Sequence, residues 1–355
     1  MTTPLMQTPG PEPAVAPDVP AAGSGRGSSL RATLRFAAGK LGGAVVSLGL
    51  VAVLAFFLFR VMPGDPAKTM LRGLPSNPAQ LAQLRHEFGL DQPLWAQFLR
   101  YMGEVFQGNL GKSFEYQRPV VDIISERLWP TLLLAGSATA LAIVVGLWLG
   151  TRSGWRRGSA FDQVSTGIAI TLWSVPTFWL GMILLMVFAV GVGPMPGLFP
   201  TGGYASPESV GLDRVLDIAH HLVLPCLTMT AVIYAQYLLV MRSSLLDELG
   251  NDYLNTARAK GLRDDQVRSR HAVPNALLPT VTLIFLHLGL IISGAITVET
   301  VYSWPGLGDL MYKALTVPDL PLLQGTFLVF SGCVIVMNVL ADLVYRLLDP
   351  RVRAS

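Results

Sequence analysis

Six stretches of apolar residues, each long enough to cross a bilayer, decide what this chain can fold into. They lie near residues 41–60, 130–150, 166–190, 222–241, 280–299 and 324–345. A transmembrane helix needs about 20 apolar residues, and hydrocarbon accepts a backbone only when its polar groups are paired. With 51% hydrophobic and 14% charged residues, the chain is also more apolar than a water-soluble domain. We therefore expect an all-α integral membrane protein with six transmembrane helices.

The basic residues of the short connections predict how the spans are oriented. On one side of the predicted membrane they are numerous: Arg26, Arg31, Arg35, Lys40, Arg152, Arg156, Arg157, Arg242, Arg258, Lys260, Arg263, Arg268, Arg270, Arg346, Arg351 and Arg353. The short connections on the other side hold only Arg214 and Lys313. Because Lys and Arg in short loops are retained in the cytoplasm, both termini are expected to be cytoplasmic.

Residues 1–30 differ in composition from the rest of the chain. They are rich in Pro, Ala, Gly and Ser with few charges. Such a segment cannot bury enough apolar surface to order itself, so we expect a disordered cytoplasmic tail ahead of a membrane domain at 31–350.

The connection from 61 to 127 is too long to be a simple link between spans, and it carries helix punctuation. Asn77 can cap a helix that has Pro78 at its first position. Asp91 and Pro93 can start a second helix that ends near Gly108. We expect a small helical external loop.

Residue patterns for covalent chemistry are missing from the sequence. The run Gly108–Ser113 resembles the end of a phosphate-binding loop, but Phe106 stands where that motif requires glycine. Cys226 and Cys333 both fall inside apolar spans, which favours packing roles over a disulfide or a metal site. We expect no ATPase site, no metal and no catalytic group on this chain.

The segment from Asp252 to Pro279 is polar and basic although it lies between two spans. Gly261 follows a run of helix formers and suits the left-handed residue that ends a helix. A second short helix, capped by Asp264 or Asp265, is expected to stop before Pro274. From these residues alone, the segment can be a docking knob or merely a basic loop placed by the orientation rule.

The same segment resembles the coupling motif of prokaryotic ABC importer permeases. Ala257, Gly261 and Pro274 match the spacing of that motif, whereas Asn255 and Thr256 stand where its general form has glutamate and alanine.

The runs 256–261 and 271–279 resemble the dipeptide and oligopeptide branch of that family more closely. Further matches to the branch occur in order along the chain at Met62–Pro66, Phe88–Pro93, Gly108–Ser113, Ser174–Gly181, Trp304–Gly308 and Asp349–Pro350. Together the matches cover roughly residues 36–350.

The resemblance implies a pore-forming permease subunit of an ATP-driven importer of di- and oligopeptides that works by alternating access in a prokaryotic inner membrane. It implies a second homologous permease, two ATP-binding subunits that hold ATP and Mg²⁺, and an external substrate-binding protein. No cofactor is expected on this chain itself, and no nucleic-acid partner. Within the loop 242–278, the residues that it assigns to ATPase coupling are Asp252, Tyr253, Ala257, Arg258, Ala259, Gly261, His271 and Asn275. Four of these, Ala257, Arg258, Ala259 and Gly261, are expected to sit in a groove of an ATPase subunit.

Four residues in or near the spans are candidates for a translocation pathway. His287 is an ionisable residue in mid-span, which marks either a relay or a histidine hydrogen-bonded to a neighbouring helix. Glu299 either touches substrate or caps the turn that follows it. Thr171 and Ser174 either line a pathway or mediate helix packing.

Other functions remain open at this stage. A proton-driven secondary transporter would use His287 and Glu299 as a relay. A membrane scaffold would anchor a cytoplasmic partner through the 252–279 segment without transport. Within the resembling branch, nickel chelates and glutathione are alternative cargoes.

Overall fold

The computed structural model describes residues 26–61, 77–87 and 90–348. The side chains of 26–34, 285–294 and 344–348, and of a few single positions, are outside this description. The expected tail therefore lies outside the described residues up to residue 25, as do the resembling segments 62–66, 88–89 and 349–350. The described residues up to 42 and those from 43 onward form two compact units, and each is described by itself.

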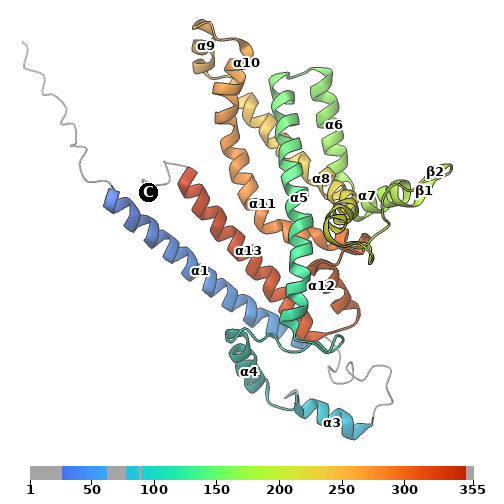
Figure 1. The fold of residues 1–355 in the computed structure, drawn as a ribbon. Coiled ribbons are helices and arrows are strands. Elements are labelled where there is room, and N and C mark those ends of the chain that lie inside the picture. The colour runs from blue at the N-terminus through green and yellow to red at the C-terminus, as the bar shows by residue number, and fades with distance from the viewer. Residues whose placement is uncertain (1–25, 62–76, 88–89, 349–355) are drawn as a thin grey trace, which may run out of the picture. The chain divides into compact units, whose positions relative to one another are not determined.

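Helices make up most of the described chain, as predicted (Figure 1). They are α1 (Arg26–Val61), α3 (Pro78–Glu87), α4 (Leu94–Phe106), α5 (Val120–Trp155), α6 (Ala160–Ser174), α7 (Thr177–Leu184), η1 (Leu185–Val190), α8 (Gly211–Leu249), α9 (Asp252–Ala259), α10 (Asp264–Val267), η2 (Arg268–Ala272), α11 (Val273–Val301), α12 (Leu307–Thr316) and α13 (Leu320–Leu348). Two short strands, β1 (Gly191–Val192) and β2 (Met195–Pro196), form the one sheet of the described residues.

Four helices of the described residues are long and apolar enough to cross a membrane. They are Arg35–Phe59 of α1, α5, α8 and Leu320–Leu343 of α13. The bent pair formed by α6 and α7–η1 is a fifth if it counts as one span. Helix α11 covers the predicted span 280–299, but much of that stretch falls among the side chains that are not described. Six crossings therefore stay a prediction.

The third predicted span, 166–190, is not one continuous helix. The chain bends by 103° between α6 and α7. Val175 takes an extended conformation (φ −81°, ψ 130°) immediately before Pro176. Proline lacks a backbone N–H and disfavours helical geometry in the residue before it, so the helix ends here and restarts in a new direction.

The expected tail boundary at residue 30 also requires correction. Helix α1 begins at Arg26, so residues 26–30 are helical. The run from Ser28 to Ala38 contains neither Gly nor Pro and includes several strong helix formers. Its intrinsic helix propensity extends the helix of the first span toward the N-terminus.

The loop 61–127, predicted to be external, contains the two helices that its capping residues, prolines and glycines predicted. Helix α3 begins at Pro78, and the Asn77 side chain accepts a hydrogen bond from the Ala79 N–H at 3.1 Å. Helix α4 begins directly after Pro93 and ends at Phe106, two residues before Gly108. Both predicted starts are confirmed.

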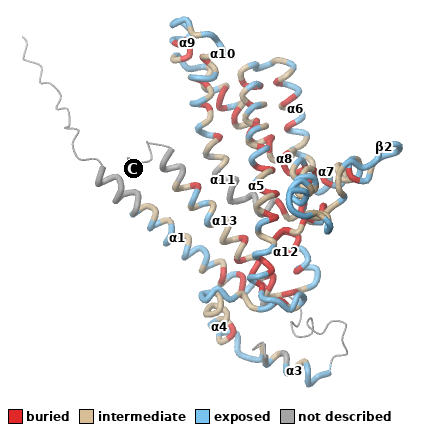
Figure 2. Tube along the Cα trace, viewed as in Figure 1, coloured by how far each residue is buried: buried red, intermediate tan, exposed pale blue. Residues whose placement is uncertain are grey.

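Helices α5 and α8 pack against each other at very short range. Gly146, Gly150 and Gly154 form a buried stripe on α5 that faces α8. Buried positions recur along α5 in Figure 2. A methyl group added at Gly150 would lie 2.6 Å from the Leu238 carbonyl oxygen, and one at Gly146 would lie 2.6 Å from Tyr237 Cβ. Small residues allow such close backbone approach, which in lipid replaces the hydrophobic drive for helix association.

We predict that Gly150→Ala destabilises the membrane domain by about 1–3 kcal/mol, because the added methyl group overpacks the helix contact. Gly136→Ala on the same helix is the matched control, since nothing lies within 4 Å of the position of its added Cβ. Thermal unfolding in detergent should give a lower midpoint for Gly150→Ala than for Gly136→Ala. Equal midpoints would contradict the close packing described above.

Candidate coupling site

The polar segment (residues 252–279) forms a compact helical hairpin at the end of α8. Helix α9 stops at Ala259, and Gly261 has a positive φ of 83°, as predicted for the residue that ends it. Helix α10 follows, with Arg263 in the cap position and Asp264 as its first residue, so the aspartates lie in the first turn instead of capping it. Figure 1 shows α9 and α10 at the same end of α8 and α11.

The second helix of the hairpin does not stop before Pro274, contrary to the prediction. A π-helical turn, η2, connects α10 directly to α11, and Pro274 lies in the first turn of α11. The first turn of a helix tolerates proline because its N–H groups have no intrahelical partner there, and the wider π turn shifts the hydrogen-bond pattern just upstream. The hairpin is therefore continuous with the following span.

One face of the hairpin is buried against the protein's own spans. Its core contains the hairpin residues Leu254, Ala257, Val267 and Ala272 and the span residues Met241, Leu245 and Ala276. Ala257 is only 6% exposed, so it is turned away from any partner. The expectation that Ala257 fills a groove of another subunit requires correction, because Ala257 fills the packing surface of α9 itself.

The opposite face of the hairpin is open to a partner. Arg258, Ala259 and Gly261 are exposed, as are Asn255 and Lys260. This face combines small residues around the left-handed turn with basic side chains at its edges. Another chain can approach the backbone closely at Ala259 and Gly261.

A hydrogen-bonded cluster around Tyr253 fastens the hairpin to two spans. The Tyr253 hydroxyl donates to Glu248 at the end of α8 at 2.5 Å, and Asn275 of α11 donates to the same hydroxyl at 3.0 Å. The His271 carbonyl oxygen lies 3.5 Å from that hydroxyl. Burial raises the pKa of the Tyr253 phenol, because the phenolate would lose its hydration. The structure thus brings together three of the predicted coupling residues, Tyr253, His271 and Asn275.

Asp264 connects the hairpin to a third span. It accepts a hydrogen bond from the Trp155 indole N–H at 3.2 Å, and Trp155 is the last residue of α5. Arg258 lies 3.4 Å from the other carboxylate oxygen of Asp264. Asp252, in contrast, is exposed in the first turn of α9. The hairpin is therefore held by α5, α8 and α11 together.

An ion pair between α6 and α8 could not be found from the sequence, where Arg242 served only as a signal of orientation. Arg242 of α8 donates two hydrogen bonds to Asp162 of α6, at 2.6 and 2.9 Å. The Asp162 side chain is 3% exposed and also accepts the Gly158 N–H at 2.9 Å. A bidentate Arg–carboxylate pair fixes orientation as well as distance, so α6 is tied to α8.

Glu299 lies at the other end of the molecule's central helices and caps a helix. Its carboxylate accepts the Gly308 N–H at 2.7 Å and the Asp309 N–H at 3.1 Å, in the first turn of α12. Thr131 of α5 donates to the other carboxylate oxygen at 2.7 Å and accepts the Leu307 N–H at 2.7 Å. Because Glu299 is fully buried, the structure favours the capping alternative over contact with substrate.

The remaining pathway candidates are Thr171 and Ser174 of α6 and His287 of α11. Thr171 and Ser174 are exposed on α6, and each hydroxyl donates to a backbone carbonyl one turn earlier, at 2.9 Å. His287 belongs to α11, but its side chain lies outside the described residues.

The run that resembled a phosphate-binding loop is part of a structural turn. Ser113 donates to the buried Asp319 carboxylate at 2.5 Å, and the Glu115 N–H donates to the same oxygen at 3.0 Å. The Leu322 N–H donates to the second oxygen of Asp319 at 3.2 Å, at the start of α13. The Ser113 hydroxyl is thus used to join the loop to α13.

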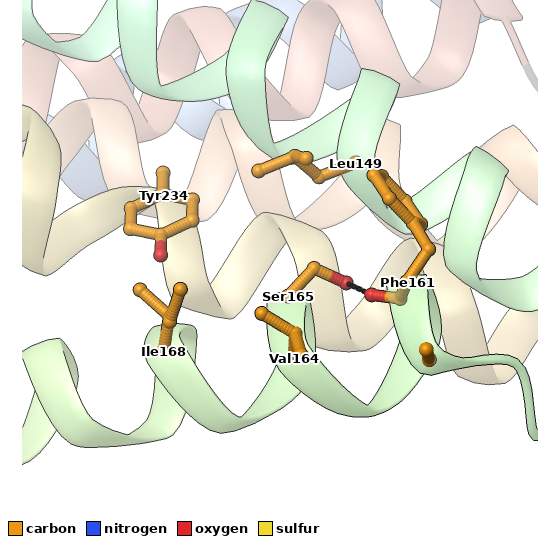
Figure 3. Close-up of a pocket in the computed structure, with 7 residues that line it drawn as sticks. Leu149, Phe161, Val164, Ser165, Ile168 and Tyr234 are labelled. Carbon is orange, nitrogen blue, oxygen red and sulfur yellow. Dashed lines mark hydrogen bonds between the residues drawn. The ribbon is translucent and has the colours of Figure 1, made fainter.

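An apolar pocket of about 460 Å³ lies between α5, α6 and α8 (Figure 3). Leu149, Phe161, Val164, Ile168 and Tyr234 contribute to its wall. The Ser165 hydroxyl in the wall already donates to the Phe161 carbonyl at 2.7 Å. None of the described residues that line it is charged, so it offers no partner for the charged ends of a peptide.

Comparisons with known proteins identify the families that the chain matches. Residues 142–354 match the family described as "Binding-protein-dependent transport system inner membrane component", and residues 33–135 match the N-terminal region of such components.

Curated relatives match over nearly their whole length. A Brucella suis protein described as a peptide permease is 37% identical, over 88% of this chain and 97% of its own length. The dipeptide transport system permease DppB of Escherichia coli K12 is 36% identical, over 90% and 99%. The glutathione transport system permease GsiC of Salmonella paratyphi A is 35% identical, over 90% and 99%. Among solved structures, a chain of the inward-facing MetNI methionine ABC transporter matches 64% of this chain at 16% identity with a TM-score of 0.48.

We predict that Thr131→Val destabilises the protein by about 1–3 kcal/mol, because it leaves the Leu307 N–H and one Glu299 oxygen without their buried partner. Thr139→Val on the same helix is the control. Thr139 is also buried, but its hydroxyl has no hydrogen-bond partner among the described residues, so its loss should be neutral or stabilising. Unfolding by SDS in mixed micelles compares the two, and equal losses would argue against the capping role of the Thr131–Glu299 pair.

Proposed function

Because the chain belongs to the family of inner membrane components of binding-protein-dependent transport systems, we propose that it is the pore-forming permease of an ATP-driven importer of small peptides. It is a multi-pass membrane transport subunit, and members of this family work with ATPase and binding-protein partners. Relatives named for dipeptides, peptides and glutathione support peptides as the cargo class.

The observation that carries the proposal is the arrangement of the hairpin formed by the polar segment. One of its faces is buried against the spans, and the other is exposed. Its buried face is fastened to α8 through Glu248, to α11 through Asn275 and to α5 through Trp155. Its open face presents Ala259 and Gly261. A basic loop present only for orientation would not need three such attachments. The geometry therefore suits a lever that receives force from a partner and passes it to the spans.

In the proposed mechanism, two ATP-binding subunits close when they bind ATP and Mg²⁺, and each moves the hairpin seated on it. Because the hairpin is attached to three spans, its displacement rotates them as one body. The Arg242–Asp162 pair makes α6 follow α8. A second, homologous permease would provide the other wall of the route, so that relative rotation opens the site to one side at a time.

The proton-driven alternative is less well supported by the geometry. A relay through Glu299 would have to release the bonds that this carboxylate accepts from Thr131, Gly308 and Asp309. Each release would also uncap the first turn of α12. The Glu299 carboxylate is thus held in a structural role, whereas a proton relay would require it to exchange hydrogen-bond partners.

We predict that Ala259→Glu uncouples transport. An unpaired carboxylate buried against an ATPase subunit costs on the order of 3 kcal/mol, or roughly a hundredfold in affinity between the subunits. ATP-dependent uptake into proteoliposomes should fall accordingly, while membrane insertion is unchanged. Ala160→Glu is the control, because Ala160 is also exposed and is the first residue of α6.

Full uptake by Ala259→Glu would refute the coupling assignment. Gly261→Arg is a second test, although it also strains the left-handed backbone at that position. Ala257→Glu is unsuitable, since it would disrupt the buried face of the hairpin itself.

We also predict that the complex, purified from its own membrane with its partner subunits, takes up dipeptides only when ATP and an external binding protein are present. A protonophore should leave uptake unchanged. Uptake without ATP that collapses with the proton gradient would instead establish a secondary transporter, and an assembled complex without any flux would indicate a scaffold. Competition by glutathione or by a nickel chelate identifies the cargo among the alternatives.

The external loop is the proposed contact for the binding protein. Deletion of residues 77–108 in the same reconstituted complex should remove the stimulation of ATP hydrolysis by that protein. Unchanged stimulation would exclude the loop as the docking surface.

A further inference from the structure

Helix α4 of the external loop carries more apolar surface than the protein covers. At about 100° per residue, its apolar side chains span an arc of roughly 160°. One half of that arc contains Phe98 and Tyr101, and the other half contains Trp95, Leu99 and Phe106. The two halves have different surroundings.

The first half of the arc packs on the end of α1. The Phe98 ring lies 5.3 Å from Phe56 and is stacked on Phe57 at 5.9 Å, and the Tyr101 ring lies 5.6 Å from Phe56. The Phe56 side chain is only 1% exposed. These ring contacts fix the position of α4 beside the first span.

The second half of the arc is uncovered. Trp95 is 67% exposed, Leu99 60% and Phe106 81%. The tube in Figure 2 shows α4 as mostly exposed and intermediate, and Gln97 is the buried residue of the helix. Large apolar side chains gathered on one face in this way mark an interaction surface.

The polar residues of α4 point away from that arc. Arg100 and Glu104 approach each other to 4.0 Å, and both are about half exposed. Gln97 is turned back to donate a hydrogen bond to the Gln92 carbonyl at 2.7 Å. The helix is therefore amphipathic, with its charges on the side opposite the exposed aromatic residues.

The contact with α1 sets the level of α4 relative to the bilayer. The first apolar span ends at Phe59, so Phe56 and Phe57 lie within about 5 Å of the end of the hydrocarbon-crossing segment. Phe57 is itself 51% exposed, and neighbouring Leu54 is 64% exposed, as expected for a surface of the span that faces lipid. The uncovered half of α4 thus continues a lipid-facing surface at the edge of the membrane.

We propose that α4 is an interfacial membrane helix whose Trp95, Leu99 and Phe106 side chains insert among the phospholipids of the leaflet at that end of the first span. Tryptophan and phenylalanine on the apolar face and charges on the opposite face suit the boundary between headgroups and acyl chains. The lipid contact anchors the external loop and leaves α3 and the Arg100–Glu104 face directed to water. This inference does not depend on the transported cargo.

The test measures the depth of single nitroxide labels on the full-length chain in nanodiscs of phosphatidylethanolamine and phosphatidylglycerol. Cys226 and Cys333, which form no disulfide, are first replaced by Ala. Labels are then attached to Leu99→Cys and Phe106→Cys, with Arg100→Cys and Glu104→Cys on the same helix as matched controls. Collision rates with oxygen, which prefers lipid, and with a nickel chelate, which prefers water, are recorded for each.

The expected result is an oxygen-to-nickel collision ratio several-fold higher at Leu99 and Phe106 than at Arg100 and Glu104. Equal ratios at all four positions would overturn the proposal. Protection of Leu99 and Phe106 from both reagents would overturn it as well. If the protection appears only after the binding protein is added, the apolar face is a docking surface for that protein. If the protection is already present before the binding protein is added, another chain covers the face.

Discussion

The close contact between α5 and α8 is the interaction on which the rest of the fold depends. Gly146, Gly150 and Gly154 bring the two backbones together near the C-terminal end of α5, and both helices continue from there toward the Glu299 turn. In a bilayer, where lipid tails compete with apolar side chains, such dense packing is what holds spans together. Two of the features described above are attached to these helices: the polar segment to the end of α8, and the Glu299 turn to α5 through Thr131.

Hydrogen-bonded clusters of polar side chains lie where the helices α5, α8 and α11 end. At one end, Glu248, Tyr253 and Asn275 form a cluster beside the Asp162–Arg242 pair. At the other end, Glu299 holds the first turn of α12, and the Trp304 indole donates to the Pro130 carbonyl at 2.9 Å. A buried polar group without a partner costs free energy, so each cluster allows only one arrangement of the helices that meet in it. Thr131 and Trp155 are about 36 Å apart along α5, which links the two clusters through one continuous helix.

This arrangement explains how a displacement of the hairpin can be transmitted to the opposite end of the central helices. A hairpin bound to a single flexible loop would move alone, whereas a hairpin bound to α5, α8 and α11 moves with them. Tyr302, at the end of α11, extends the connection, because its hydroxyl lies 2.9 Å from the Thr228 hydroxyl of α8 and donates to the Gly181 carbonyl of α7 at 3.0 Å. The bent α6–α7 pair is thus joined to the same body through both of its helices.

The sequence by itself determined the features that depend on neighbouring residues: the apolar stretches, the helix starts at Pro78 and Leu94, and the end of α9 at Gly261. Proline, glycine and capping side chains act within a few residues, so their effects can be read locally. Only the tertiary structure decided that Ala257 faces inward, that Arg242 pairs with Asp162, and that Glu299 caps a helix. The glycine stripe on α5 has a recognisable four-residue spacing, but its partner surface on α8 does not follow from spacing. These outcomes depend on residues far apart in the chain, such as Thr131 and Glu299, and on the rotation of each helix about its axis, which close packing alone fixes.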